Sequence, residues 1–209
     1  NVLVDYLDTV KEREFDFPFL ALLPALGFYD VHYTHGQVEF GKDFIAKRVE
    51  NGDEIQYSFQ SKAGDIGQSD WRNNVMAQML ESVLTDLSHP SFDRSLSHRP
   101  VLVTTGRLKG NAALGLQDLN ARIEQQFERS PVDLWDREQL ADDLESYGLE
   151  GVHGATASGF TSLGDFYRLY GKSLRGDVSE REIVSTKSAS HITVFREFLA
   201  PGWIFTSPR

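Results

Sequence analysis

The chain has 209 residues, of which 40% are hydrophobic and 25% are charged, a composition typical of a globular protein with one sizeable core. Its formal net charge of −10 argues against a protein that coats nucleic acid non-specifically, because such proteins are usually basic. The absence of cysteine excludes disulfides and thiolate metal sites. No apolar run approaches the roughly 20 residues of a membrane span, and the acidic first residues, NVLVDYLDTVKERE, do not resemble a secretory leader. We therefore expect a cytoplasmic protein with no membrane partner.

Helical and strand patterns alternate over the first 150 residues. Apolar residues at helical spacing predict a helix over 2–13, and an apolar run predicts a second helix over 15–28, with Asp16 as its N-cap candidate. In chain order the other predicted elements are strand 29–34, hairpin 39–62, helix 70–87, strand 100–105, helix 111–127, strand 132–135 and helix 137–146. This order predicts an α/β fold, with a mixed central sheet of a three-strand meander plus two crossover strands and with helices on both faces.

The composition changes after residue 150. Residues 151–164 are rich in Gly, Ser, Thr and Ala, which is typical of a linker or mobile loop. We therefore expect one domain over residues 1–150. Residues 151–209 would form a linker and a C-terminal extension of unknown role.

The predicted hairpin carries the residues that suggest chemistry. Asn51-Gly52 favours a tight turn, because both residues tolerate the positive φ that such a turn requires. Gln60 and Lys62 are two residues apart on one strand and so share a face. Asp43 on the neighbouring strand can then face an amide and an ammonium, an arrangement suited to a hard cation and a phosphodiester. The alternative is that these residues form an ordinary solvated strand face.

Four segments follow one another in a characteristic order. They are Phe15-Asp16 with an apolar helix ending at Leu26-Gly27-Phe28, then Gly41-Lys42-Asp43, then Gln60-Ser61-Lys62, then the strand–helix–strand–helix run from Val101 to Leu140. Together they resemble the PD-(D/E)XK nuclease superfamily, and specifically its Mrr-type restriction endonuclease-like domain. The resemblance covers about residues 10–147. The chain departs from the family pattern in having Asp16 where the family has Glu, and two prolines in that helix.

The resemblance implies a Mg²⁺-dependent endodeoxyribonuclease that hydrolyses phosphodiester bonds in DNA, in restriction or phage defence. It implies that Asp43, Gln60 and Asp16 hold the metal and that Lys62 lies against the attacking water or the scissile phosphate. Mg²⁺ suits these ligands because it takes hard oxygen donors, and we expect Mn²⁺ to substitute. From the residues alone, Asp16 is equally well explained as an N-cap.

DNA would have to be attracted by basic side chains beside the site, because the chain as a whole is acidic. The candidates are Lys42, Arg72, Arg107 and Lys109. The turn after a strand often lies beside the ligand crevice of an α/β sheet, so we expect Arg107 and Lys109 to border the cleft. The segment 131–150, with seven acids and one base, should then face away from the cleft.

Two other classes of function stay open. The first is a catalytically inactive nuclease-fold module for nucleic-acid binding or assembly, favoured by the acidic charge and by Gln60 where the superfamily usually has a second acid. The second is a structural interaction domain with no nucleic-acid role. For an active enzyme the expected partners are DNA and either a second copy of the chain or a larger defence assembly, because cutting both strands usually needs two active sites.

Overall fold

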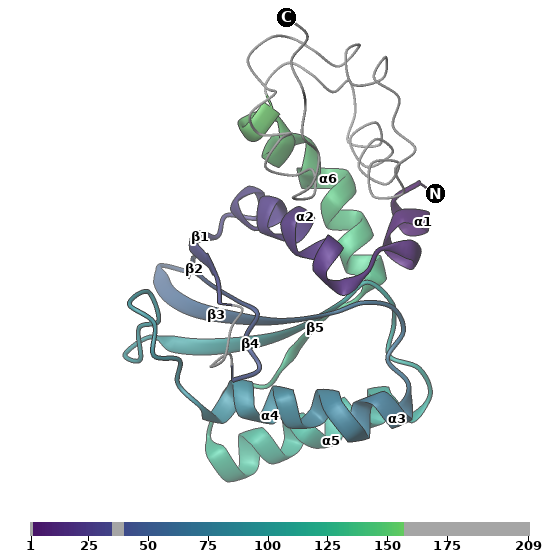
Figure 1. The fold of residues 1–209 in the computed structure, drawn as a ribbon. Coiled ribbons are helices and arrows are strands. Elements are labelled where there is room, and N and C mark those ends of the chain that lie inside the picture. Colours follow the sequence, from purple (N-terminus) through teal and green to yellow (C-terminus); the bar gives the residue numbers. More distant parts are fainter. Residues whose placement is uncertain (1, 35–39, 157–209) are drawn as a thin grey trace, which may run out of the picture.

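The computed structural model describes residues 2–34 and 40–156, which form an α/β structure around one mixed sheet (Figure 1). The strands lie in the order β1-β2-β3-β4-β5, which is also their order in the chain. β1 to β3 form an antiparallel meander, and β4 and β5 extend the sheet in parallel. The bounds of the strands are β1 Tyr29–Tyr33, β2 Phe44–Glu50, β3 Asp53–Lys62, β4 Ser97–Thr104 and β5 Asp133–Trp135. The predicted sheet, a three-strand meander plus two crossover strands, is confirmed.

Helices cover both faces of the sheet, as predicted (Figure 1). One face carries α1 (Val2–Thr9), α2 (Glu12–Ala25) and α6 (Arg137–Thr156), and its core is rich in aromatic rings, among them Phe19, Phe28 and Phe59. The other face carries α3 (Gln68–Asp70), α4 (Met76–Leu84) and α5 (Asn111–Arg122), packed around residues such as Trp71, Leu102 and Leu116. Two π-helical turns continue these helices, η1 (Trp71–Val75) between α3 and α4, and η2 (Ile123–Phe127) after α5.

The hairpin between β2 and β3 has the predicted turn. Asn51 and Gly52 have φ angles of 53° and 94°, so both occupy the left-handed region that a primed turn requires. The turn fixes the register, which pairs Glu50 with Asp53 and Phe44 with Phe59. Local turn chemistry therefore sets which residues face one another further along the two strands, at the candidate site.

The second helix begins earlier than predicted. α2 starts at Glu12, and the side chain of Glu14 accepts a hydrogen bond from the backbone N–H of Lys11 (3.1 Å), which satisfies a donor at the helix start. The prediction that Asp16 caps this helix is therefore wrong, because Asp16 lies inside α2. Pro18 is likewise in the helix interior.

The last helix is longer than the predicted helix 137–146. α6 runs to Thr156, so a boundary at residue 150 falls inside a helix, and the first residues of the predicted linker are helical. The rest of the predicted linker and extension lies outside the described residues. None of the helices that the structure describes is long and apolar enough to cross a membrane.

Candidate active site

Asp43 and Gln60 face each other across the hairpin. The Gln60 side-chain amide donates a hydrogen bond to Asp43 Oδ2 (2.7 Å), and the backbone N–H of Ser61 donates to the same oxygen (2.7 Å). The three residues are buried. Two donors thus fix the Asp43 carboxylate against β3, and the predicted pairing of a carboxylate with the Gln60 amide is present in the structure.

Asp16 approaches from α2 and is linked to β1 by a tyrosine. The Tyr33 hydroxyl donates a hydrogen bond to Asp16 Oδ2 (3.0 Å). Burial raises the pKa of Tyr33, and the carboxylates of Asp16 and Asp43 both raise it further. Because both carboxylates act on the same hydroxyl, Tyr33 lies within electrostatic range of each of them.

Lys62 lies at the end of β3, and strand alternation places it on the same face as Gln60. Its ammonium is 3.4 Å from the carboxylate of Glu12, in the first turn of α2. Glu12 precedes Asp16 by four residues, so both lie on one face of the helix. α2 therefore contacts Lys62 through Glu12 and Tyr33 through Asp16.

Sequence reasoning missed Glu12 and Tyr33. It placed Glu12 in the first helix, which it extended to residue 13, and it started the second helix only at residue 15, whereas α2 starts at Glu12. The spacing of four residues between Glu12 and Asp16 was the available signal, because it puts two acids on one helical face. No local signal pointed to Tyr33, whose role depends on the packing of β1 beside α2.

The oxygen atoms at this site suit a hard cation. Asp43 and Asp16 offer carboxylates, and Gln60 offers an amide carbonyl, donors that Mg²⁺ accepts. The buried hydroxyl of Ser61 has no hydrogen-bond partner among the described residues, but strand alternation places it on the opposite face of β3 from Gln60 and Lys62. Across residues 2–34 and 40–156, no three His, Cys, Asp or Glu side chains are grouped so that they could hold a metal ion. A cation site here therefore depends on Gln60.

Lys42 lies in the interior, and this contradicts its predicted contact with DNA. Its side chain is 0% exposed, and its ammonium donates a hydrogen bond to the backbone carbonyl of Thr85 (2.7 Å). Burial lowers the pKa of Lys42 to about 8, and this is opposed by the negative charges of Asp86 and Glu81. The backbone just before Lys42 is irregular, because Phe40 and Gly41 both have positive φ.

Arg107 and Lys109 lie in the loop after β4, beside the loop that follows Lys62. Arg107 pairs with Glu138 (Nε to Oε1, 2.7 Å), and Lys109 pairs with Asp65 (3.2 Å). The segment 131–150, which we expected to face away from the cleft, contacts this loop through Glu138. The backbone N–H of Arg137 donates to Gly106 O (2.9 Å), and this bond holds the first turn of α6 against the loop.

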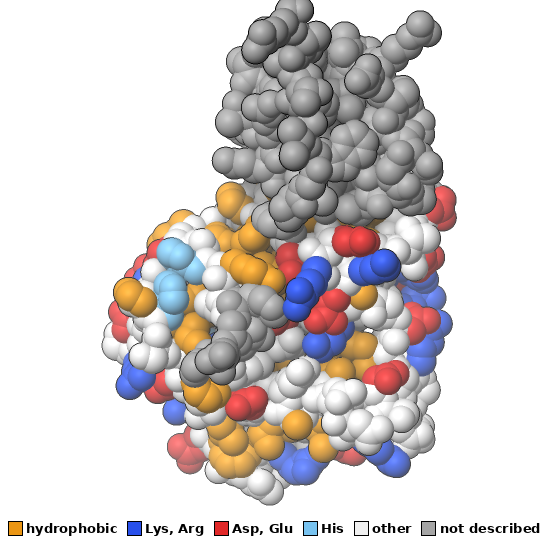
Figure 2. Space-filling model, in the orientation of Figure 1, with side chains coloured by type: hydrophobic (Ala, Val, Ile, Leu, Met, Phe, Trp, Pro, Cys, Tyr) orange, Lys and Arg blue, Asp and Glu red, His pale blue; other side chains and the backbone are white. Residues whose placement is uncertain are grey.

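Arg72 is exposed on η1 and lines a cavity of about 380 Å³ between the α3–η1 segment and α5. Among the described residues, no carboxylate forms an ion pair with it. On the face shown in Figure 2, acidic and basic side chains are interleaved, and the basic ones do not form a continuous patch.

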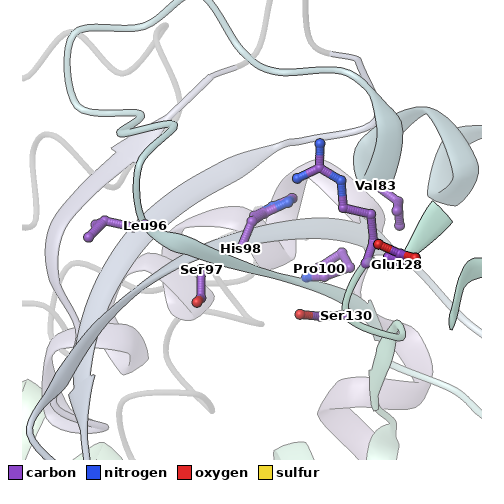
Figure 3. Close-up of a pocket in the computed structure, with 8 residues that line it drawn as sticks. Val83, Leu96, Ser97, His98, Pro100, Glu128 and Ser130 are labelled. Atoms are coloured by element: carbon purple, nitrogen blue, oxygen red, sulfur yellow. The ribbon is translucent and has the colours of Figure 1, made fainter.

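A second pocket, of about 200 Å³, lies at the opposite end of β4 from Thr104, the residue that pairs with Lys62 (Figure 3). His98 lines it, and His98 Nε2 is hydrogen-bonded to the Ser58 hydroxyl (2.8 Å), which also contacts the Ser82 hydroxyl (3.1 Å). Burial is the main cause that lowers the pKa of His98 to about 3. This polar cluster is separate from the Asp43 site.

No protein-family model matches the chain, and no curated protein matches it significantly. Solved structures that are similar to it include restriction endonuclease FokI bound to DNA, with 15% sequence identity and a TM-score of 0.49 over 73% of this chain and 28% of that chain. FokI in a second structure is 14% identical, with a TM-score of 0.46 over 87% of this chain and 28% of that chain. MspJI restriction endonuclease in complex with a 27-mer oligonucleotide is 16% identical, with a TM-score of 0.43 over 79% of this chain and 33% of that chain. The chain thus spans a third or less of the length of each.

Proposed function

We propose that residues 1–150 are a restriction endonuclease-like domain of the PD-(D/E)XK superfamily, of Mrr type, and that it cleaves DNA with the help of Mg²⁺ in restriction or phage defence. The observation that carries this proposal is the hydrogen bond of 2.7 Å between the Gln60 amide and the Asp43 carboxylate. Asp43 and Gln60 are the residues in which the sequence resembles the family's G-x-D and Q-x-K motifs.

Each residue of the site would have a distinct role in cleavage. Asp43, the Gln60 carbonyl and Asp16 would hold Mg²⁺, for which Mn²⁺ is a substitute. The bound ion would polarise the phosphodiester and activate a water for attack. Lys62 would orient the nucleophile and stabilise the negative charge that develops on the phosphate.

Glu12 has a role in this scheme that the motifs alone do not give. It holds the Lys62 ammonium at 3.4 Å, and the Glu12 side chain is 47% exposed. Exposed ion pairs contribute only about 0–1 kcal/mol, so a DNA phosphate can replace Glu12 as the partner of Lys62 at little cost. Glu12 would therefore keep Lys62 directed toward α2 until substrate arrives.

Cleavage of supercoiled plasmid DNA with Mg²⁺ tests the proposal. Asp43→Asn should abolish cleavage, and Lys62→Gln should slow it by about 10²–10³-fold, as expected for a lost transition-state contact. Asp53→Asn and Lys47→Gln are matched controls, because Asp53 lies beside the hairpin turn and Lys47 is a partly buried lysine paired with Asp30. Cleavage that persists in both site variants would show that the site is assigned wrongly.

The alternative is a nuclease-fold module that binds nucleic acid or supports assembly without cutting. Among the described residues it is favoured by the lack of a three-carboxylate cluster, because Gln60 stands where an acid would complete one. Calorimetric titration with Mg²⁺ separates the two functions. An enzyme should take up the ion in the parent and not in Asp43→Asn, whereas an inactive module should show no carboxylate-dependent uptake in either.

The proposal extends to partners and place of action. Cutting both strands usually needs two active sites, so we propose that the chain acts as a homodimer or within a larger defence assembly, in the cytoplasm. Sedimentation analysis with and without a DNA duplex tests the first part. A monomer under both conditions, in a protein that cuts both strands, would contradict it.

A further inference from the structure

Lys42 precedes Asp43, yet its side chain is directed away from the site and toward the end of α4. The ammonium donates to the carbonyl of Thr85 (2.7 Å) and lies 3.4 Å from the carbonyl of Phe40. Thr85 is the C-cap of α4, where backbone carbonyls lack partners within the helix and the helix dipole favours a positive charge. The ammonium also lies over the ring of Phe92, 5.9 Å from the ring centroid.

The backbone on either side of Lys42 is held at several points. Gly41 has a φ of 65°, and a Cβ added there would lie 2.1 Å from the Gln78 carbonyl oxygen of α4, so the chain crosses the helix in direct contact. The Thr34 hydroxyl donates to the Lys42 carbonyl, and the Thr34 N–H donates to the Asp43 carbonyl (2.9 Å). The segment is thus fixed between α4 and β1.

A buried lysine at this position needs an explanation. Removing an ammonium from water is unfavourable, and an apolar side chain of similar length avoids that penalty. The hydrogen bonds that the Lys42 ammonium forms in the described residues go to carbonyl oxygens, not to carboxylates. The Lys42 side chain therefore connects the end of α4 to the residue next to Asp43 through a hydrogen bond.

We propose that Lys42 is a positioning residue that holds Asp43 in place for metal binding, an inference that rests on the proposed function. Through Thr85 it anchors the segment 41–43 to α4, and the Asp43 carboxylate then stays on the Gln60 amide and the Ser61 N–H. Loss of the anchor should let the carboxylate leave these donors. The Lys42 side chain would touch neither the metal nor the substrate, because its ammonium is directed toward Thr85.

The Ser61 amide reports directly on the position of Asp43, because its N–H donates to Asp43 Oδ2. Amide hydrogen exchange at Ser61, measured by NMR in the full 209-residue chain, therefore tests the anchor without DNA or metal. In Lys42→Met we expect faster exchange at Ser61. We also expect the Kd for Mg²⁺ to rise by about tenfold or more, the usual effect of removing a group that orients a metal ligand.

Gln56→Met is the matched control. Gln56 is a buried polar side chain on the same strand, and its amide donates to the Ala46 carbonyl (3.0 Å), far along β3 from Asp43. Gln56→Met should lower the Tm but leave the rate of amide exchange at Ser61 and the affinity for Mg²⁺ unchanged. Lys42→Arg, which keeps a cation within reach of Thr85, should restore both properties. If Lys42→Met does not fold, Lys42→Gln takes its place in the same comparison.

The outcomes separate this inference from the proposed function. If the parent binds no Mg²⁺, the proposed function fails, while faster Ser61 exchange in Lys42→Met still supports the anchor. If the parent binds Mg²⁺ and Lys42→Met leaves both the Ser61 exchange and the Kd unchanged, the inference is overturned. A loss of Tm alone, equal to that of Gln56→Met, also overturns it.

Discussion

Gln60 forms with Asp43 a hydrogen bond that a charged carboxylate at position 60 could not donate. We predict that Gln60→Glu lowers the free energy of unfolding by about 1–3 kcal/mol without metal, because two buried acids would then face each other and one must take up a proton. Mg²⁺ should reverse much of this loss, since it binds the folded state with an added carboxylate ligand. Thermal unfolding with and without Mg²⁺ measures both effects. Gln56→Glu, at another buried position of β3, is the control and should show no reversal by Mg²⁺.

His98 gives the protein a pH dependence of stability that is independent of the Asp43 site. Its pKa is lowered from 6.5 to about 3, mainly by burial, with Lys42 and Arg129 adding to the effect. Below pH 6.5 the unfolded chain binds a proton that the folded chain does not bind until about pH 3, so stability falls as the pH decreases through that window.

We predict a loss of about 2 kcal/mol from His98 between pH 6.5 and pH 5, at about 1.4 kcal/mol per pH unit. His98→Gln should remove this part of the slope, because it keeps a polar partner for Ser58 and does not titrate. Urea unfolding at the two pH values measures the difference. Equal slopes in the parent and the variant would mean that His98 is already protonated in the folded state.

The packing of the α3–η1 segment on α5 depends on one glycine. A Cβ added at Gly115 would lie 2.3 Å from Nε1 of Trp71, whose ring is buried and cannot move aside cheaply. Alanine is the better helix former by about 1 kcal/mol, but overpacking a core typically costs about 1–3 kcal/mol, so the clash should win.

We therefore predict that Gly115→Ala destabilises the protein by roughly 1 kcal/mol in chemical denaturation. Trp71→Phe tests whether the clash with the Trp71 ring causes the loss of stability, because the smaller ring leaves room for the added methyl group. In a double-mutant cycle the pair should be less destabilising than the sum of the single changes. If the losses of stability in the two single variants simply add, the effect of Gly115→Ala does not come from a clash with Trp71.

Local chemistry explains why the strands were predictable. Asn51-Gly52 sets the hairpin turn, the run PVLVTT marks a strand buried on both faces, and the register of the hairpin then follows. The π-helical turns were not predictable in this way. The segment from residue 70 has the period of an ordinary α-helix, and the widening at η1 accompanies the contact of Trp71 with Gly115, which only the folded structure brings together.

The candidate site was predictable where it depended on the hairpin alone. Asp43 and Gln60 face each other because the turn fixes their register, so the sequence was sufficient for that pair. Lys42 was not predictable, since its burial depends on the end of α4, more than forty residues away in the chain. The position of Asp16 inside α2 was not predictable, because the predicted helix began at residue 15, three residues after the true start at Glu12.

If the protein acts on DNA as proposed, the DNA has to approach a chain with a formal net charge of −10. Most basic side chains near the candidate site are already paired with acids, as Arg107 is with Glu138 and Lys109 with Asp65. A phosphate that displaces these acids leaves their negative charges uncompensated nearby. Arg72 differs, because no described carboxylate pairs with it, so its charge is available to a phosphate without such a displacement.

We predict that Arg72→Gln reduces the slope of log Kobs against log salt by roughly one unit, the value for one lost phosphate contact. The double variant Arg107→Gln with Lys109→Gln should reduce the slope by less than two units, because each of these bases exchanges an existing ion pair for a phosphate. Fluorescence anisotropy with a duplex of arbitrary sequence, over a range of salt concentrations, measures all three slopes. Arg94→Gln is the control, since Arg94 is exposed and lies near Asp86 (3.7 Å), in the loop before β4. If Arg72→Gln leaves the slope unchanged while the double variant lowers it by two units, DNA docks on the loop after β4 rather than along η1.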